Sequence, residues 1–121
     1  MMRKPASSFN HAFFGLRWIF KTQPNFRIHF LLSALSIFGG WYFKISYGEF
    51  LTILVLITVG LVVESINTAI EETIDAIHKD WSEAIKLAKD VSAASMLIFA
   101  IGSIIVASVI FVPKILERFY F

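Results

Sequence analysis

The sequence predicts an all-α integral membrane protein in which three transmembrane helices follow an amphipathic surface helix. Hydrophobic residues make up 57% of the 121 residues, and the mean hydropathy is +0.72. Soluble domains contain about 45–50% apolar residues, and a small domain buries only about 60% of its surface on folding. This excess of apolar residues therefore indicates that much of the chain lies in a lipid bilayer. Cysteine is absent, which excludes disulfides and thiolate metal sites.

Residues 6–23 are predicted to form the surface helix. Apolar side chains recur at helical spacing between Phe9 and Phe20, and cationic or titratable side chains are interleaved with them: His11, Arg17 and Lys21. This pattern is typical of a helix that lies in the plane of the membrane interface. An ordinary helix packed on the spans would show the same pattern, so both interpretations stay open. Pro24 is expected to separate this helix from the first span.

Three apolar runs predict the transmembrane helices, which we place at residues 27–45, 49–78 and 84–112. A hydrocarbon core of about 30 Å needs roughly 20 helical residues. The run Val91–Val112 is long enough by itself. The first run is slightly short, but the long side chains of Arg27 and Lys44 at its ends can reach the interface. The second run reaches full length only if its helix continues past Glu64.

The distribution of lysine and arginine predicts the orientation of the chain. Eight basic residues lie before the first span or in the second loop: Arg3, Lys4, Arg17, Lys21, Arg27, Lys79, Lys86 and Lys89. The other side of the membrane receives three: Lys44, Lys114 and Arg118. By the positive-inside rule, the N-terminus lies in the cytoplasm and the C-terminus lies outside. We expect a multi-pass protein of the inner or plasma membrane.

Carboxylates are concentrated where the second apolar run ends. Seven of the nine acidic residues fall between Glu64 and Asp90. At about 100° per residue, one helix face carries Glu64, Asn67, Glu71 and Asp75. Like charges at this spacing repel, and carboxylates near hydrocarbon lose solvation, so a cation should compensate. Mg²⁺ bound through one or two carboxylates and phosphate oxygens would do so, and Lys86 and Lys89 could contribute.

Other acidic residues in this region are expected to be ordinary solvated surface groups: Glu72, Asp80 and Glu83. Asp75 and His78 could both bind a metal, but a di-metal bundle site needs such a pair from each of two helices. The chain has no Walker A loop, glycine-rich GxGxxG loop, protein-kinase motif or nucleophile elbow. A bound nucleotide would therefore be held by a different arrangement.

Four strings in the sequence resemble the prokaryotic diacylglycerol kinase family, which includes the undecaprenol kinases. E-S-I-N-T-A-I-E (Glu64–Glu71), followed by Asp75, is similar to the family signature E-x-x-N-[ST]-A-[IV]-E-x-x-x-D. A-K-D-V-S-A-A-S (Ala88–Ser95) resembles the second signature block. The N-terminal S-F-x-H-A-x-x-G (Ser8–Gly15) and N-F-R-I-H (Asn25–His29) also fit. The resemblance spans nearly the whole chain, in order.

This resemblance implies a homotrimer whose active sites are shared between chains at the cytoplasmic interface. The implied reaction moves the γ-phosphate of ATP to the hydroxyl of a membrane lipid alcohol, with Mg²⁺. By motif position, Glu64 would be the general base and Asn67 would orient the site. Glu71 would hold Mg²⁺ on the nucleotide. Six further residues would contact the nucleotide: His11, Asp80, Trp81, Ser82, Lys89 and Asp90. Arg17 would lie near the lipid-facing entrance of the site.

Two positions depart from the best-studied branch of that family. Gln23 stands where that branch has a second glutamate that binds the metal beside the nucleotide. The amide oxygen of Gln23 can also ligate Mg²⁺, but it contributes no charge. His29 also stands where that branch has a glutamate. The N-F-x-[IF]-H form is similar to the undecaprenol kinase branch, so we expect a polyprenol acceptor, with diacylglycerol as the other possibility.

Two further hypotheses belong to other functional classes. An ion- or proton-relaying membrane subunit would also place carboxylates near hydrocarbon. It should carry ionisable groups through the membrane depth, yet Phe30–Trp41 and Leu97–Val112 contain none. A trimeric homologue with impaired catalysis is the other hypothesis, motivated by Gln23. We expect no nucleic-acid partner.

Overall fold

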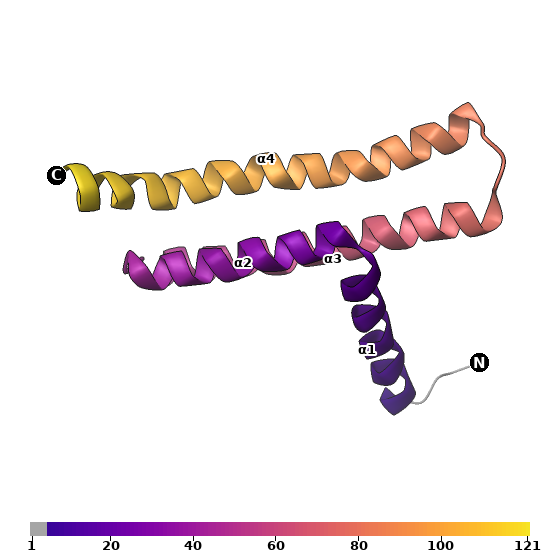
Figure 1. Ribbon diagram of the computed structural model, residues 1–121, viewed down its shortest axis with the longest axis horizontal. Helices are drawn as coiled ribbons and strands as arrows, with labels where there is room; N and C mark the ends of the chain where they lie inside the picture. The colour runs from indigo at the N-terminus through magenta and orange to yellow at the C-terminus, as the bar shows by residue number, and fades with distance from the viewer. Residues whose placement is uncertain (1–4) are drawn as a thin grey trace.

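The computed structural model describes residues 5–121, which form four α-helices. They are α1 (Pro5–Thr22), α2 (Pro24–Tyr42), α3 (Tyr47–Ile77) and α4 (Glu83–Tyr120). Helices α2, α3 and α4 run lengthwise, while α1 projects away from them at the α1–α2 junction (Figure 1). Arg3 and Lys4, which contribute to the predicted orientation, lie outside the described residues.

Short polar and proline signals set where the helices begin. Ser46 caps α3, since its hydroxyl accepts a hydrogen bond of 3.1 Å from the backbone N–H of Glu49. Ser82 caps α4 in the same way, with Ile85 N–H as donor at 3.2 Å. Such caps satisfy backbone donors that have no partner inside the helix. Pro24 occupies the first turn of α2, where its missing N–H costs nothing.

The turn between α2 and α3 is tight. Lys44 adopts a φ of 53°, in the left-handed region, and Ile45 N–H donates to the carbonyl of Gly40 at 3.1 Å. A Cβ on Gly40 would lie 2.8 Å from Cδ1 of Ile45. A side chain at residue 40 would have to displace the end of the Ile45 side chain, so the turn is packed closely around Gly40.

Helix α3 packs against both α2 and α4. The contacts between α3 and α4 progress in antiparallel register, from Asp75 with Lys89, through Asn67 with Ser92, to Gly60 with Phe99. Gly60 lies directly under the Phe99 ring, because an added Cβ would lie 2.5 Å from Cζ of Phe99. This register places the polar half of α3 opposite the first turns of α4.

Helices α3 and α4 are long and apolar enough to cross a membrane, by length and composition. Their outer surfaces are strongly apolar: Leu97, Ile98 and Val109 are 62%, 72% and 70% exposed. The buried hydrophobic core of the described chain consists only of Ile19, Phe26, Ile53 and Ile110. Apolar surface of this extent is typical of contact with lipid or with another protein. The structure thus supports an all-α membrane protein.

The helix lengths place the carboxylates near one end of the bundle. The 31 residues of α3 extend about 46 Å and the 38 residues of α4 about 57 Å, whereas a hydrocarbon core is about 30 Å thick. The apolar part of α3 before Glu64 uses most of that thickness. Helix α4 continues through Pro113 to Tyr120, eight residues beyond the end that the apolar run predicts for the span.

Candidate active site

Glu64 is the best-buried polar side chain of the described residues, with 3% of its surface exposed. It lies on α3 among other buried residues of the same helix, Ile53, Gly60, Asn67 and Thr68. Within residues 5–121 both ion pairs involve other carboxylates, so Glu64 has no cationic partner there. A buried carboxylate without a partner is costly. Such groups are found mainly where function requires them.

Asn67 lies one turn beyond Glu64 and is fixed from α4. The hydroxyl of Ser92 donates a hydrogen bond of 2.6 Å to Asn67 Oδ1, and both residues are 8% exposed. Because this carbonyl oxygen is occupied by Ser92, the two N–H groups of the amide are the part of Asn67 left for a ligand. A donor pair suits a phosphate or hydroxyl oxygen.

Glu71 is half-buried on the same face, two turns beyond Glu64. The negative charge of the Glu71 carboxylate acts on the carboxyl group of Glu64 and on the ammonium group of Lys89. Lys89, in the polar turns of α4 that precede the apolar run, donates to Asp75 Oδ1. This ion pair connects the polar end of α3 to the first turns of α4.

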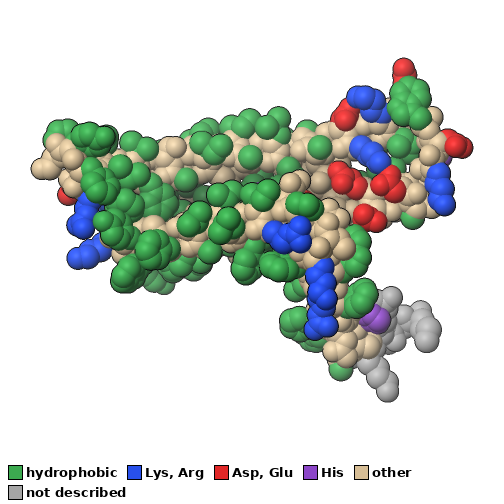
Figure 2. Space-filling model, in the orientation of Figure 1, with side chains coloured by type: hydrophobic (Ala, Val, Ile, Leu, Met, Phe, Trp, Pro, Cys, Tyr) green, Lys and Arg blue, Asp and Glu red, His purple; other side chains and the backbone are tan. Residues whose placement is uncertain are grey.

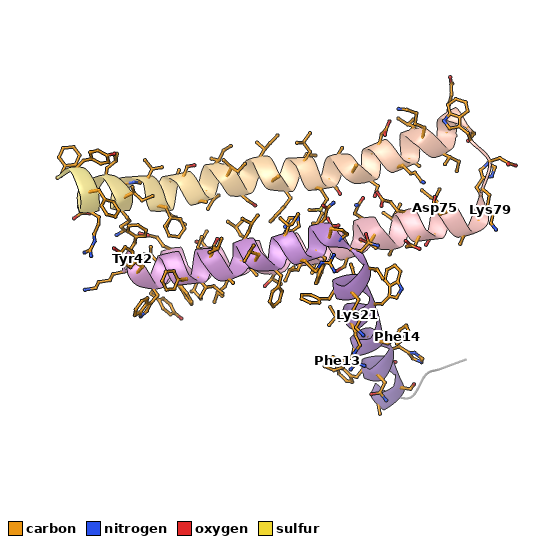
Figure 3. The ribbon with its side chains drawn as sticks, in the orientation of Figure 1. Phe13, Phe14, Lys21, Tyr42, Asp75 and Lys79 are labelled. Atoms are coloured by element: carbon orange, nitrogen blue, oxygen red, sulfur yellow. The ribbon has the colours of Figure 1, made fainter. Side chains whose placement is uncertain are left out.

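A cavity of about 310 Å³ opens at the α3–α4 loop. It gathers four of the expected nucleotide residues, namely Asp80, Trp81, Lys89 and Asp90, together with Asp75 and His78. Figure 3 shows Asp75 and Lys79 at this end of the molecule. Trp81 is 75% exposed and so presents its ring for stacking. The cavity thus combines an aromatic face with charges of both signs.

Besides Lys89, two of the expected nucleotide residues in this region already have partners. Ser82 uses its hydroxyl oxygen to cap α4. Asp90 accepts a hydrogen bond of 2.6 Å from Lys86 on the same helix, and both side chains are exposed. An exposed ion pair of this kind contributes little to stability. It can therefore exchange for a ligand at small cost.

The expected residues on α1 lie apart from this cluster. His11 and Arg17 are exposed on a helix that leaves the bundle (Figure 1). Gln23 is half-buried at the junction with α2, and its side chain makes no capping hydrogen bond. In the part of the chain that the structure describes, no group of three or more His, Asp or Glu side chains is placed to hold a metal ion. A complete metal site would need groups from elsewhere.

A second crevice lies on the neighbouring flank of α3. It measures about 450 Å³ and runs between α1, from Ala12 to Ile19, and α3, from Ser65 to Glu72. Its lining is apolar apart from Ser65, Thr68 and Glu72. The same part of α3 therefore directs Asn67 and Asp75 toward α4, and Ser65, Thr68 and Glu72 toward α1.

Comparison with known proteins identifies the family. The sequence model of the prokaryotic diacylglycerol kinases matches residues 10–111. The chain belongs to the prokaryotic diacylglycerol kinase family. An undecaprenol kinase of Bacillus subtilis is 34% identical over 108 residues, which cover 89% of this chain and 88% of that protein. A diacylglycerol kinase of Synechocystis sp. is 31% identical over 114 residues, covering 91% of this chain and 63% of that protein.

The two strongest family motifs face each other across the α3–α4 hairpin. Glu64, Asn67, Glu71 and Asp75 come from the first motif, and Lys89 and Ser92 from the second. The sequence indicated no role for Ser92 or Thr68, although both are buried here. The only signal for Ser92 was its place inside the second motif.

The described residues are compatible with Mg²⁺ in this family site. Glu64 and Glu71 make no ion pair within residues 5–121. Mg²⁺ commonly binds through one or two carboxylates and completes its shell with substrate phosphates and water. Glu71, whose carboxylate makes no ion pair within residues 5–121, can supply one such ligand.

Proposed function

We propose that this protein is an ATP-dependent lipid kinase that transfers a γ-phosphate to the hydroxyl of a membrane lipid alcohol at the cytoplasmic face. The observation that carries this proposal is the buried Glu64 carboxylate, which lies where the apolar part of α3 ends and has no cation beside it in residues 5–121. A lipid hydroxyl at headgroup depth can reach such a group. The family and the names of both relatives support the same reaction.

In this proposal Glu64 acts as the general base. The hydroxyl oxygen of the lipid attacks the γ-phosphorus, the bond to the ADP oxygen breaks, and the hydroxyl proton passes to Glu64. Phosphoryl transfer needs mainly positioning and charge stabilisation. Asn67, held by Ser92, orients the reacting groups through its N–H donors. Bound Mg²⁺ would neutralise phosphate charge, held by Glu71 with Gln23.

The nucleotide is proposed to occupy the cavity at the α3–α4 loop. Lys89 would contact phosphate, and Trp81 would stack on the base. The remaining proposed contacts are His11, Gln23, Asp80, Ser82 and Asp90, with Arg17 at the lipid entrance. Neither His11 nor Gln23 lines the cavity at the α3–α4 loop of its own chain, so these contacts would come from a neighbouring chain. This supports a homotrimer with shared sites.

The proposed topology has three spans. Helix α2 would form the first, with Arg27 and Lys44 at its ends, and α3 and α4 the others. Helix α1 would lie on the cytoplasmic surface, since it leaves the bundle at an angle suited to the membrane plane (Figure 1). The N-terminus would be cytoplasmic and the C-terminus outside the inner or plasma membrane.

Undecaprenol is the proposed acceptor. The undecaprenol kinase matches this chain over 88% of its own length, whereas the diacylglycerol kinase is matched over 63%. The N-F-R-I-H string ending at His29 favours the same branch. Diacylglycerol is the alternative acceptor.

The test measures transfer of radiolabelled γ-phosphate from ATP, with Mg²⁺, into undecaprenol or diacylglycerol in mixed micelles. We expect wild type to label undecaprenol, and Glu64→Gln to lower turnover by roughly 10²–10⁴-fold, the usual contribution of a general base. Glu72→Gln is the matched control, since Glu72 is exposed on another flank. Helix content and oligomer size should be unchanged. Equal phosphate incorporation by wild type and Glu64→Gln would overturn the proposal.

A second candidate, a trimeric homologue with impaired catalysis, is favoured only by Gln23. It predicts tight ATP binding without turnover, and recovery of turnover in Gln23→Glu. The ion-relay hypothesis has less support, because Phe30–Trp41 and Leu97–Val112 contain no ionisable side chain. Ion flux into liposomes without ATP would favour it.

A further inference from the structure

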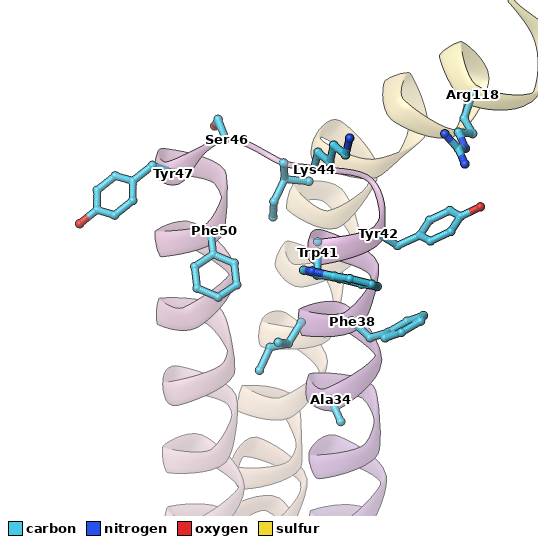
Figure 4. A pocket seen from close by; sticks show the side chains of 12 residues that line it. Ala34, Phe38, Trp41, Tyr42, Lys44, Ser46, Tyr47, Phe50 and Arg118 are labelled. Carbon is cyan, nitrogen blue, oxygen red and sulfur yellow. The ribbon is translucent and has the colours of Figure 1, made fainter.

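A large groove lies at the end of the molecule opposite the carboxylate cluster. It has a volume of about 1200 Å³ and is formed by the end of α2, the turn after it, the start of α3 and the end of α4. Its most distinctive lining residues are Phe38, Trp41, Tyr42, Lys44, Tyr47 and Arg118 (Figure 4). Ordinary small-molecule pockets measure roughly 300–1,000 Å³. The groove is therefore large enough for a longer ligand.

The aromatic lining indicates the depth of this groove in the membrane. Trp41 and Tyr47 are 73% and 79% exposed. Tryptophan and tyrosine are enriched where hydrocarbon meets headgroups, since their rings have an apolar body and a polar edge. Ala34, Ile37 and Phe38 continue the lining along α2 toward the apolar centre. One end of the groove thus suits headgroups and the other suits acyl chains.

The charged lining is entirely cationic. Lys44 and Arg118 line the groove, and no acidic residue does. The two ion pairs within residues 5–121 lie near the other end, so neither of these cations is neutralised by a carboxylate there. The guanidinium of Arg118 lies over the Tyr42 ring, 5.2 Å from its centroid. Figure 2 shows basic side chains beside hydrophobic ones at this end of the molecule.

Neighbouring residues add a third cation and two acids, one of which is Glu49 in the first turn of α3. Lys114 and Glu117 line an adjoining cavity of about 510 Å³ together with Lys44 and Arg118. The tight turn through Gly40 fixes the backbone at Lys44, whose φ is 53°. A non-glycine residue in this conformation is uncommon. The turn thus holds the Lys44 backbone at the mouth of the groove.

We propose that this groove binds an anionic phospholipid. The headgroup phosphate would lie between Lys44 and Arg118, and one acyl chain would run along Ile37 and Phe38. A phosphodiester carries a negative charge that complements the two cations, and the apolar lining along α2 complements an acyl chain. Free phosphate would match only the cations and would leave the long apolar part of the groove unfilled. The inference does not depend on kinase activity, because no proposed active-site residue lines the groove.

The test uses Trp41 as a local probe. Trp18→Phe and Trp81→Phe leave Trp41 as the single tryptophan. The protein is reconstituted in phosphatidylcholine vesicles that contain brominated phosphatidylglycerol or, separately, the same fraction of brominated phosphatidylcholine. We expect phosphatidylglycerol to quench Trp41 with a roughly fivefold or higher apparent affinity, since each cation near an anionic lipid contributes about that factor. Lys44→Gln with Arg118→Gln should bring the ratio close to one.

Two matched variants keep this test independent of folding. Lys21→Gln with Arg27→Gln removes the same charge elsewhere and should retain the preference. Lys44→Arg with Arg118→Lys keeps the charge and should also retain it. The inference is overturned if the preference survives removal of both groove cations, or if inorganic phosphate in the buffer abolishes it. It is also overturned if neither lipid quenches Trp41 and cross-linking shows a second copy of the chain on this face.

Discussion

Replacing Ser92 with alanine tests how the site is held together. The Ser92 hydroxyl donates to Asn67 Oδ1 at 2.6 Å, between two residues that are each 8% exposed. Hydrogen bonds between membrane helices contribute about 0.6 kcal/mol on average and about 1.7 kcal/mol at most. Leaving a buried polar group without a partner costs about 1–3 kcal/mol. Since water reaches neither side chain easily, we expect Ser92→Ala to lose about 1.5 kcal/mol.

The same change should slow the reaction. Without Ser92 the Asn67 amide can rotate, so its N–H donors no longer point consistently at the reacting groups. A loss of about 1.4 kcal/mol corresponds to a tenfold change, and we therefore expect kcat to fall about tenfold. The KM for ATP should change little, because an orienting interaction made mainly in the transition state acts on kcat.

Thermal unfolding in detergent and initial-rate kinetics over a range of ATP concentrations would measure both effects. Ser92→Thr keeps the hydroxyl and should recover most of the lost rate. Ser95→Ala is the control, because the Ser95 hydroxyl donates only to the backbone of its own helix in the described chain. If Ser92→Ala matched wild type in both stability and kcat, the positioning role of this hydrogen bond would be refuted.

Three further substitutions test other contacts. Gly60→Ala places a Cβ 2.5 Å from Phe99 Cζ and should lower the free energy of unfolding, measured by thermal unfolding, by about 1–3 kcal/mol. Gly102→Ala is the control, because Gly102 has open space around it and the change should not destabilise the protein. Equal melting temperatures of the two variants would contradict the close contact at Gly60. Gln23→Glu adds a carboxylate to the proposed metal site and should lower the Mg²⁺ concentration needed for half-maximal turnover, whereas an unchanged Mg²⁺ dependence would remove this residue from the site. Lys89→Gln should raise the KM for ATP by roughly tenfold while changing stability by less than about 1 kcal/mol, because its ion pair is exposed; an unchanged KM would exclude it from the nucleotide contact.

Much of the architecture follows from local sequence signals. The family resemblance is confirmed by the match over residues 10–111, and the all-α membrane class is supported by the helices. The prediction of three spans goes further than the structure does, since among the helices of residues 5–121 only α3 and α4 are long and apolar enough to cross a membrane. Arg27 and His29 in the first turns of α2 shorten its apolar part.

Helix ends and cross-helix pairs were harder to predict. The apolar run of α4 stops at Pro113, yet the helix continues to Tyr120, because proline removes one backbone bond without ending a helix when the later turns can still form. Both Lys86 and Lys89 were expected to offset the carboxylates of α3. Only Lys89 reaches across to α3, while Lys86 pairs within its own helix, a choice that depends on the register between helices.

The antiparallel register of α3 and α4 also limits where the chain can lengthen during evolution. An extra residue between Ser82 and Ser92 would turn every later side chain of α4 by about 100°, and Ser92 would then point away from Asn67. Extra residues at His78–Asp80 leave both helices unrotated, since this stretch precedes the Ser82 cap. Length variation among natural homologues should therefore accumulate in the hairpin loop and be rare in the first three turns of α4.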